Sequence, residues 1–129
     1  MIVLDTHIWI WWVQGDVKLT ASHRELIQAN ESTGLGVPAI SCWEVAKLAA
    51  AGRVSFDVPI GEWMATALAY PGVTLLPLTP EIAVDACNLP KPIHKDPADQ
   101  LIIATARIHK CPLFTFDQKI LDYPHVELV

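Results

Sequence analysis

Ile2-Val3-Leu4-Asp5-Thr6-His7 is the stretch that decides the fold of this chain. Its first three residues are apolar without polar alternation, which predicts a short central strand buried on both faces. Asp5 follows directly, at the carboxyl end of that strand. In open α/β sheets ligands bind at this edge, beside the point where the strand order reverses. The stretch therefore places an acid at a potential ligand site, although Asp5 could equally serve as the cap of the helix that follows.

The composition is that of one globular domain. The 129 residues are 52% hydrophobic and 18% charged, which suffices for one core but not for two domains, so we expect a single domain over residues 1–129. No run approaches the ~18 apolar residues needed to cross a bilayer, and no basic residue precedes the apolar N-terminal segment. We therefore expect a soluble cytoplasmic protein. The cysteines are odd in number and widely spaced, which argues against disulfides and a zinc site; they are Cys42, Cys87 and Cys111.

The formal net charge of −5 does not indicate a nucleic-acid-binding protein. Proteins that bind phosphate backbones normally carry a basic surface. Acids gathered around metal ions would change this balance, because two divalent cations would reduce the charge to about −1.

Strand-like and helical segments alternate along the rest of the chain. A helix at 8–13 is followed by a second one that Thr20 or Ser22 caps, with Ser22 and Glu25 as a possible capping box. Gly, Pro and capping residues divide the remainder into strands and helices. We expect strands at 35–40, 73–78, 112–116 and, at a final edge, 126–129, and helices at 41–51, 59–69, from 80 and at 97–109. This order predicts a three-layer α/β/α sandwich with a mostly parallel central sheet.

Three further acids occupy positions similar to that of Asp5. Glu44 lies three residues after Ser41 in the first turn of a predicted helix, where it could also complete a capping box. Asp99 lies in the first turn of another helix, and Asp117 directly follows the last core strand. Because a parallel sheet brings the carboxyl ends of its strands to one edge, we expect the four acids to converge.

Converging carboxylates indicate a metal-dependent hydrolysis. Acids packed a few ångströms apart raise each other's pKa, so they are stable as anions only around a cation. A ligand set of oxygen atoms favours Mg²⁺ or Mn²⁺ over zinc. Such ions lower the pKa of a bound water and stabilise an in-line displacement at phosphorus. The pattern therefore predicts phosphodiester hydrolysis without a protein nucleophile.

Four motifs in register resemble one known family. They are Asp5-Thr6-His7, Ser41-x-Trp43-Glu44, Asp96-Pro97-x-Asp99 leading into Leu-Ile-Ile-Ala-Thr-Ala, and Thr115-x-Asp117. Each motif alone is weak, but together they resemble the PIN-domain ribonucleases, and among these most closely the VapC toxins of bacterial type II toxin–antitoxin pairs. The resemblance covers essentially the whole chain.

The resemblance implies an Mg²⁺- or Mn²⁺-dependent endoribonuclease. It implies that the catalytic, metal-binding acids are Asp5, Glu44, Asp99 and Asp117. Accessory residues are then Asp96, Thr115 and Thr6. It also implies a homodimer and a VapB-like antitoxin that inserts a basic side chain among the acids. Gln100 stands where these toxins often carry an arginine, which puts in doubt a local ion pair or RNA contact but not the metal site.

Several residues near the acids have more than one interpretation. The cations that flank the proposed site could bind RNA phosphates or simply aid solubility; these are Lys47, Arg53, Lys91 and Lys95. Trp43 could stack on a base, anchor the antitoxin or belong to the core. An isolated histidine such as His7 or His94 is more often a hydrogen-bonding bystander than a catalyst.

Two other functions compete with the ribonuclease. The first is a PIN-like fold that binds RNA or a protein without catalysis. The second is a phosphatase or phosphotransfer domain with Asp5 as the nucleophile, but His7 stands where such enzymes of the haloacid-dehalogenase kind carry a second aspartate. Retained RNA binding without turnover would favour the first, and a phospho-enzyme trapped at Asp5 the second.

Overall fold

Four short parallel strands form the central sheet of the computed structural model, which describes residues 1–129. The strands are β1 (Ile2–Leu4), β2 (Leu35–Pro38), β3 (Val73–Leu76) and β4 (Leu113–Phe114). They are arranged in the order β3-β2-β1-β4, and every pairing is parallel. The chain extends from β1 through β2 to β3 on one side and then returns to place β4 on the other side. The strand order therefore reverses between β1 and β4, where ligands of α/β sheets bind.

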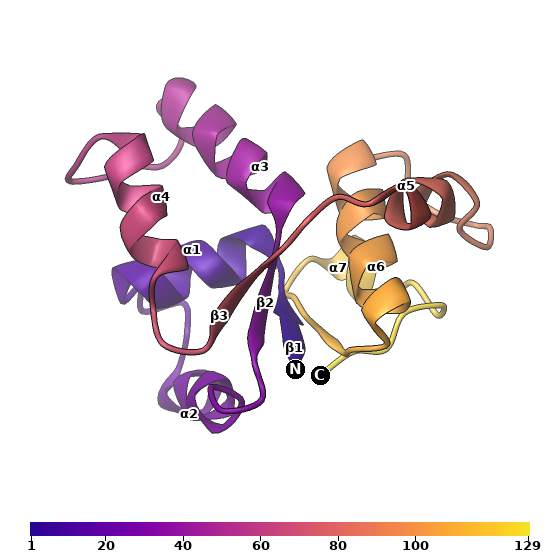
Figure 1. The fold of residues 1–129 in the computed structure, drawn as a ribbon, viewed down its shortest axis with the longest axis horizontal. Coiled ribbons are helices and arrows are strands. Elements are labelled where there is room, and N and C mark those ends of the chain that lie inside the picture. The colour runs from indigo at the N-terminus through magenta and orange to yellow at the C-terminus, as the bar shows by residue number, and fades with distance from the viewer.

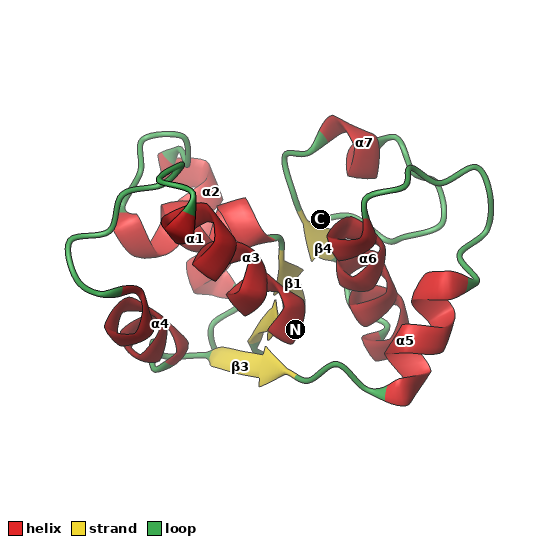
Figure 2. Ribbon diagram, turned by 90° about the horizontal axis from the view of Figure 1, so that it is seen from above, coloured by secondary structure: helices red, strands yellow, loops and turns green.

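Seven helices cover the two faces of this sheet. They are α1 (Thr6–Gln14), α2 (Ala21–Ala29), α3 (Ala39–Ala50), α4 (Ile60–Leu68), α5 (Pro80–Cys87), α6 (Pro97–His109) and α7 (Gln118–Leu121). Helices α1 to α4 lie on one side of the sheet and α5 to α7 on the other (Figures 1 and 2). This arrangement confirms the predicted three-layer α/β/α sandwich. None of the helices has the length and apolar character needed to span a membrane.

Strand β1 is buried on both faces because it lies inside the sheet between two helical layers. Ile2 and Leu4 pack into the cluster that contains Trp9 and Trp63. Val3 points the other way and packs into a second cluster with Ile102. At most 4% of any β1 residue is exposed, which confirms the prediction made from its unbroken apolar run and fixes the position of Asp5 at the sheet edge.

The start of α3 differs from the prediction in a way that matters for the site. Pro38, with φ −61° and ψ 140°, ends β2, and α3 begins at Ala39, two residues before Ser41. The helix has no side-chain cap hydrogen bond, so the capping box between Ser41 and Glu44 is wrong. Glu44 instead lies in the second turn, where its carboxylate is available for other contacts.

Other helix caps and strand ends also differ from the sequence prediction, each for a local reason. Thr20 caps α2 and forms a capping box with His23, so the box predicted for Ser22 and Glu25 is wrong. The strand predicted at 73–78 ends before Pro77, which has no N–H to donate to a sheet. The predicted final edge strand is wrong too, because it contributes only one bridge, from Leu128 to Leu113. The two-residue β4 leaves little strand for it to pair with.

Candidate active site

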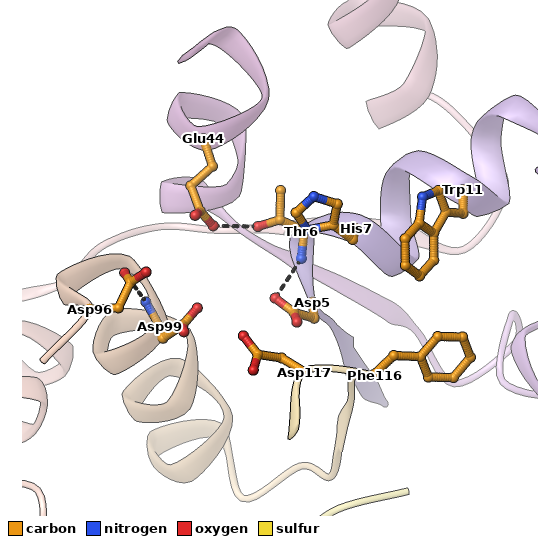
Figure 3. Close-up of a pocket in the computed structure, with 9 residues that line it drawn as sticks. All are labelled: Asp5, Thr6, His7, Trp11, Glu44, Asp96, Asp99, Phe116 and Asp117. Atoms are coloured by element: carbon orange, nitrogen blue, oxygen red, sulfur yellow. Dashed lines mark hydrogen bonds between the residues drawn. The ribbon is translucent and has the colours of Figure 1, made fainter. Parts of the chain in front are cut away.

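The carboxyl ends of β1 and β4 open into a cavity of about 400 Å³ (Figure 3). Nine residues from distant parts of the chain line it, namely Asp5, Thr6, His7, Trp11, Glu44, Asp96, Asp99, Phe116 and Asp117. Five of the nine are acids. The fold therefore brings the four acids singled out in the sequence into one cavity, together with the accessory residues Thr6 and Asp96.

Asp5 connects the two strands at the point where the strand order reverses. Its Oδ1 accepts a hydrogen bond from the Thr6 backbone N–H at 2.8 Å, so it does cap α1. Its Oδ2 accepts from the Thr115 hydroxyl at 2.6 Å. The same Thr115 oxygen accepts from the Asp117 backbone N–H at 3.0 Å. Asp5 thus both caps α1 and faces the cavity. Thr115 does not line the cavity, but it fixes Asp5 and the segment that carries Asp117.

Glu44 is held by the first turn of α1 rather than by its own helix. The Thr6 hydroxyl donates to Glu44 Oε1 at 2.6 Å, and it forms a second hydrogen bond, of 2.9 Å, with Ser41 Oγ. Thr6 and Ser41 are both almost fully buried. The contact sets the direction in which the Glu44 carboxylate enters the cavity.

Asp99 is held by a histidine from the preceding loop. Asp96 caps α6 by accepting from the backbone N–H groups of Ala98 and Asp99. His94 Nε2 lies 2.7 Å from Asp99 Oδ2. The Gln100 side chain donates to the His94 backbone oxygen at 2.9 Å. Gln100 therefore stabilises the position of the loop that carries His94, and His94 fixes one oxygen of Asp99.

Burial raises the pKa of three of the acids. Burial is the largest effect on the pKa of Asp5, and the hydrogen bonds from Thr115 and Thr6 oppose it. It also raises the pKa of Glu44, with the negative charge of Asp5 adding to the effect. Burial raises the pKa of Asp99 from 3.8 to about 6, against the hydrogen bond from His94. In each case the cost of burying the charged carboxylate exceeds what the neighbouring hydrogen bonds and charges return.

The donor set of the cavity fits a hard divalent cation. Every carboxylate is an oxygen donor, as Mg²⁺ and Mn²⁺ prefer. The internal hydrogen bonds engage Oε1 of Glu44, Oδ2 of Asp99 and Oδ1 of Asp117, so that the second oxygen of each carboxylate has no hydrogen-bond partner. In this conformation no three of the side chains are arranged to hold one ion together. Joint ligation therefore requires these side chains to rotate toward one another.

The cations proposed as RNA contacts do not line the cavity. Lys47 and Arg53 are exposed, and Lys91 and Lys95 border a separate depression. Trp43 is 53% exposed, which makes the core reading of this residue wrong. The Lys47 ammonium lies 4.3 Å from the centre of its ring. The RNA-binding roles of Lys47, Arg53 and Lys95 remain predictions.

The sequence reasoning missed the aromatic lining of the cavity. The sequence predicts a helix over 8–13 and a strand over 112–116, but these predictions place neither Trp11 nor Phe116 at the site. One signal was available, because His7 and Trp11 are four residues apart on the helix that follows Asp5 and therefore share a face. For Phe116 the signal was only its position directly before Asp117.

Comparisons with known proteins agree with this fold and this cavity. Residues 2–126 match the family model of the PIN domain. The chain is 32% identical over 124 residues to Ribonuclease VapC22 of Mycobacterium tuberculosis, covering 96% of this chain and 92% of that protein.

Two solved structures have the same fold. VapBC2 from Rickettsia felis, bound to a DNA fragment from its promoter, aligns with a TM-score of 0.75 and 15% identity over 100% of this chain and 98% of that one. A toxin–antitoxin complex from Klebsiella pneumoniae aligns with a TM-score of 0.66 and 21% identity over 100% and 97%. The resemblance inferred from the four motifs is thus confirmed, and the chain belongs to the PIN-domain family.

Proposed function

We propose that this protein is a metal-dependent endoribonuclease, the toxin of a toxin–antitoxin pair, which hydrolyses RNA phosphodiester bonds in the acidic cavity. The observation that carries the proposal is the convergence of Asp5, Glu44, Asp99 and Asp117 at the reversal of strand order. It is supported by the 32% identity to a protein named as a ribonuclease.

The four acids would hold one or two Mg²⁺ or Mn²⁺ ions. When bound, such an ion lowers the pKa of a water molecule and stabilises the charge that develops on the phosphate in an in-line displacement. Three of the ligands have a pKa raised by burial, so a cation relieves an unfavourable charge density that the protein leaves uncompensated.

The surrounding residues position these acids and favour an anionic substrate. Thr6 and His94 each fix one carboxylate oxygen, of Glu44 and of Asp99, and leave the other oxygen without a hydrogen-bond partner. Thr115 fixes Oδ2 of Asp5, whose Oδ1 accepts from the Thr6 backbone. The N-termini of α1 and α6 also meet at the cavity. The partial positive charge of a helix N-terminus stabilises carboxylates and phosphate there. No cysteine, serine or lysine lines the cavity, which is consistent with a water molecule as the nucleophile.

The proposed protein partner is a VapB-like antitoxin. The structural relatives include VapBC2 from Rickettsia felis and a toxin–antitoxin complex from Klebsiella pneumoniae. The cavity offers five carboxylates and no basic side chain apart from His7. A basic residue inserted by the partner would form charge-assisted hydrogen bonds there and would compete with the metal. The homodimer stays a prediction.

The test compares cleavage of a single-stranded RNA by the wild type and Asp5→Asn, with Mg²⁺, Mn²⁺ or EDTA. We expect cleavage by the wild type with either ion, no cleavage in EDTA, and none by Asp5→Asn. The matched control is Asp57→Asn, because Asp57 is an exposed acid outside the cavity; it should cleave like the wild type. Circular dichroism checks that Asp5→Asn is folded.

Two results would contradict the proposal. Undiminished cleavage by Asp5→Asn would remove the acids from the chemistry. RNA binding without turnover in every divalent metal tested would favour the non-catalytic PIN-like module instead. Expression in a bacterium adds a cellular readout, since growth should stop with the wild type and continue with Asp5→Asn.

A further inference from the structure

One wall of the acidic cavity is aromatic. His7, Trp11 and Phe116 line the side away from the carboxylates of α3 and α6 (Figure 3). The ring centres of Trp11 and Phe116 are 5.8 Å apart with an angle of 38° between the planes, and those of His7 and Trp11 are 5.6 Å apart at 51°. Acids and aromatic rings thus share one continuous cavity.

These rings are supported from behind but remain accessible. His23 packs against Phe116 with ring centres 4.8 Å apart, and Phe114 does so at 5.7 Å. Phe114 is 6% exposed, whereas Phe116, two residues later, is 37% exposed. His7 is exposed as well. The wall is therefore a supported apolar surface that faces solvent, and none of the hydrogen bonds that position the acids involves it.

We propose that this aromatic wall is a nucleobase-binding subsite, which stacks the base of a nucleotide whose phosphate lies at the carboxylates. The inference rests on the proposed function and adds a substrate contact to it. Aromatic side chains stack on any base because every base has a π-face. The 5.8 Å between Trp11 and Phe116 is less than two stacking distances of about 3.4 Å each. The base is therefore not sandwiched between the two rings and stacks on the solvent-exposed part of the wall, where Phe116 is 37% exposed.

One cation lies beside the wall. The Lys18 ammonium lies 5.2 Å from the centre of a Trp11 ring, and its side chain is 60% exposed. Its only ion pair, with Asp16, is long at 3.7 Å. Lys18 is therefore a cation next to the wall that a nucleotide phosphate could contact.

The subsite has a consequence for the class of substrate. A base can stack on the wall only when it is not buried within a duplex, since bases that proteins stack are unpaired and splayed out. The substrate is therefore RNA that is single-stranded, or looped, at the nucleotide next to the cleaved bond.

The experiment measures the contribution of the base to binding by calorimetric titration in Mn²⁺. The probes are adenosine 5′-monophosphate and ribose 5-phosphate, which share sugar and phosphate and differ in the base. We expect the nucleotide to bind the wild type about 5- to 150-fold more tightly than ribose 5-phosphate, the range for stacking on an aromatic side chain.

Two substitutions of Phe116 test the ring itself. Phe116→Leu keeps an apolar side chain but removes the π-face, so it should lower the ratio of the two affinities at least about 5-fold. The affinity for ribose 5-phosphate should be unchanged. Phe116→Tyr keeps the ring and should keep the ratio. Trp43→Leu is the control, because Trp43 is an exposed aromatic residue that does not line the cavity.

The outcomes separate this inference from the proposed function. If RNA is cleaved in Mn²⁺ but the nucleotide binds no more tightly than ribose 5-phosphate, the subsite is refuted and the ribonuclease stands. An unchanged ratio in Phe116→Leu would also refute it. If the wild type neither binds the probes in Mn²⁺ nor cleaves RNA, the proposed function is refuted, and the subsite that rests on it is refuted too.

Discussion

Replacing Asp99 with asparagine is predicted to stabilise the metal-free protein at neutral pH. Asp99 is 9% exposed, and burial raises its pKa from 3.8 to about 6. An acid whose pKa is raised by folding binds its proton more tightly in the folded state than in the unfolded chain. Below pH 4 it therefore does not oppose folding. As the pH rises from about 4 to about 6 the folded protein loses stability, and above that range the full penalty applies.

The magnitude follows from the pKa of Asp99. The span from 3.8 to about 6 corresponds to a penalty of about 3 kcal/mol at neutral pH. Asparagine avoids this penalty, but it replaces the charge-assisted hydrogen bond between His94 Nε2 and Asp99 Oδ2 with a weaker neutral one. We therefore expect Asp99→Asn to raise the free energy of unfolding by about 1–3 kcal/mol at pH 7.5 in EDTA, with no gain near pH 4.

Urea unfolding of both proteins between pH 4 and 8 provides the measurement. The difference between variant and wild type isolates Asp99 from the other acids, and Asp57→Asn serves as a control that should show no difference at any pH. Mn²⁺ at 1,000 times its Kd should reverse the order, because it stabilises the wild type by about 4 kcal/mol. The reasoning is refuted if Asp99→Asn is no more stable than the wild type at pH 7.5 in EDTA, or if its advantage grows as the pH falls.

Three further substitutions test the supports of the site and of the sheet. Thr115→Val removes the hydroxyl that donates to Asp5 at 2.6 Å and should lower the free energy of unfolding by about 1–3 kcal/mol, while Thr115→Ser keeps it; equal urea midpoints would contradict this. His94→Ala frees the carboxylate that it holds at 2.7 Å and should weaken Mn²⁺ binding about 10-fold in calorimetry, whereas an unchanged affinity would exclude a positioning role. Gly72→Ala would place a Cβ 2.5 Å from a backbone oxygen at φ +82° and should cost about 2–4 kcal/mol of stability. Gly61→Ala, in open space, should be neutral or stabilising by up to about 1 kcal/mol, and similar losses in the two variants would disprove the steric argument.

The features that the sequence predicts well are those set by local chemistry. The unbroken apolar run at Ile2–Leu4 identified the internal strand, because a strand buried on both faces has no polar alternation. Proline and capping residues located α5 and α6. The acids then converged because parallel topology requires it, and not because any one motif showed it.

The features that the sequence did not predict depend on contacts across the fold. A capping box between Ser41 and Glu44 fits the local sequence, but α3 begins at Ala39, directly after Pro38. Glu44 instead accepts a hydrogen bond from Thr6, 38 residues away. The link from Thr115 to Asp5 spans 110 residues. Such contacts have no local signature. The aromatic wall was missed for the same reason, since Phe116 reaches the cavity only once β4 is placed beside β1.

Anomalous diffraction at the manganese edge, from crystals grown with Mn²⁺, tests the shared cation site most directly. The account predicts a peak within ligand distance, about 2.0–2.3 Å, of carboxylate oxygens from at least three of Asp5, Glu44, Asp99 and Asp117. Crystals of Asp5→Asn grown in the same way should lose that peak. A wild-type crystal in saturating Mn²⁺ that shows no peak in the cavity, or a peak bound elsewhere, would contradict the account.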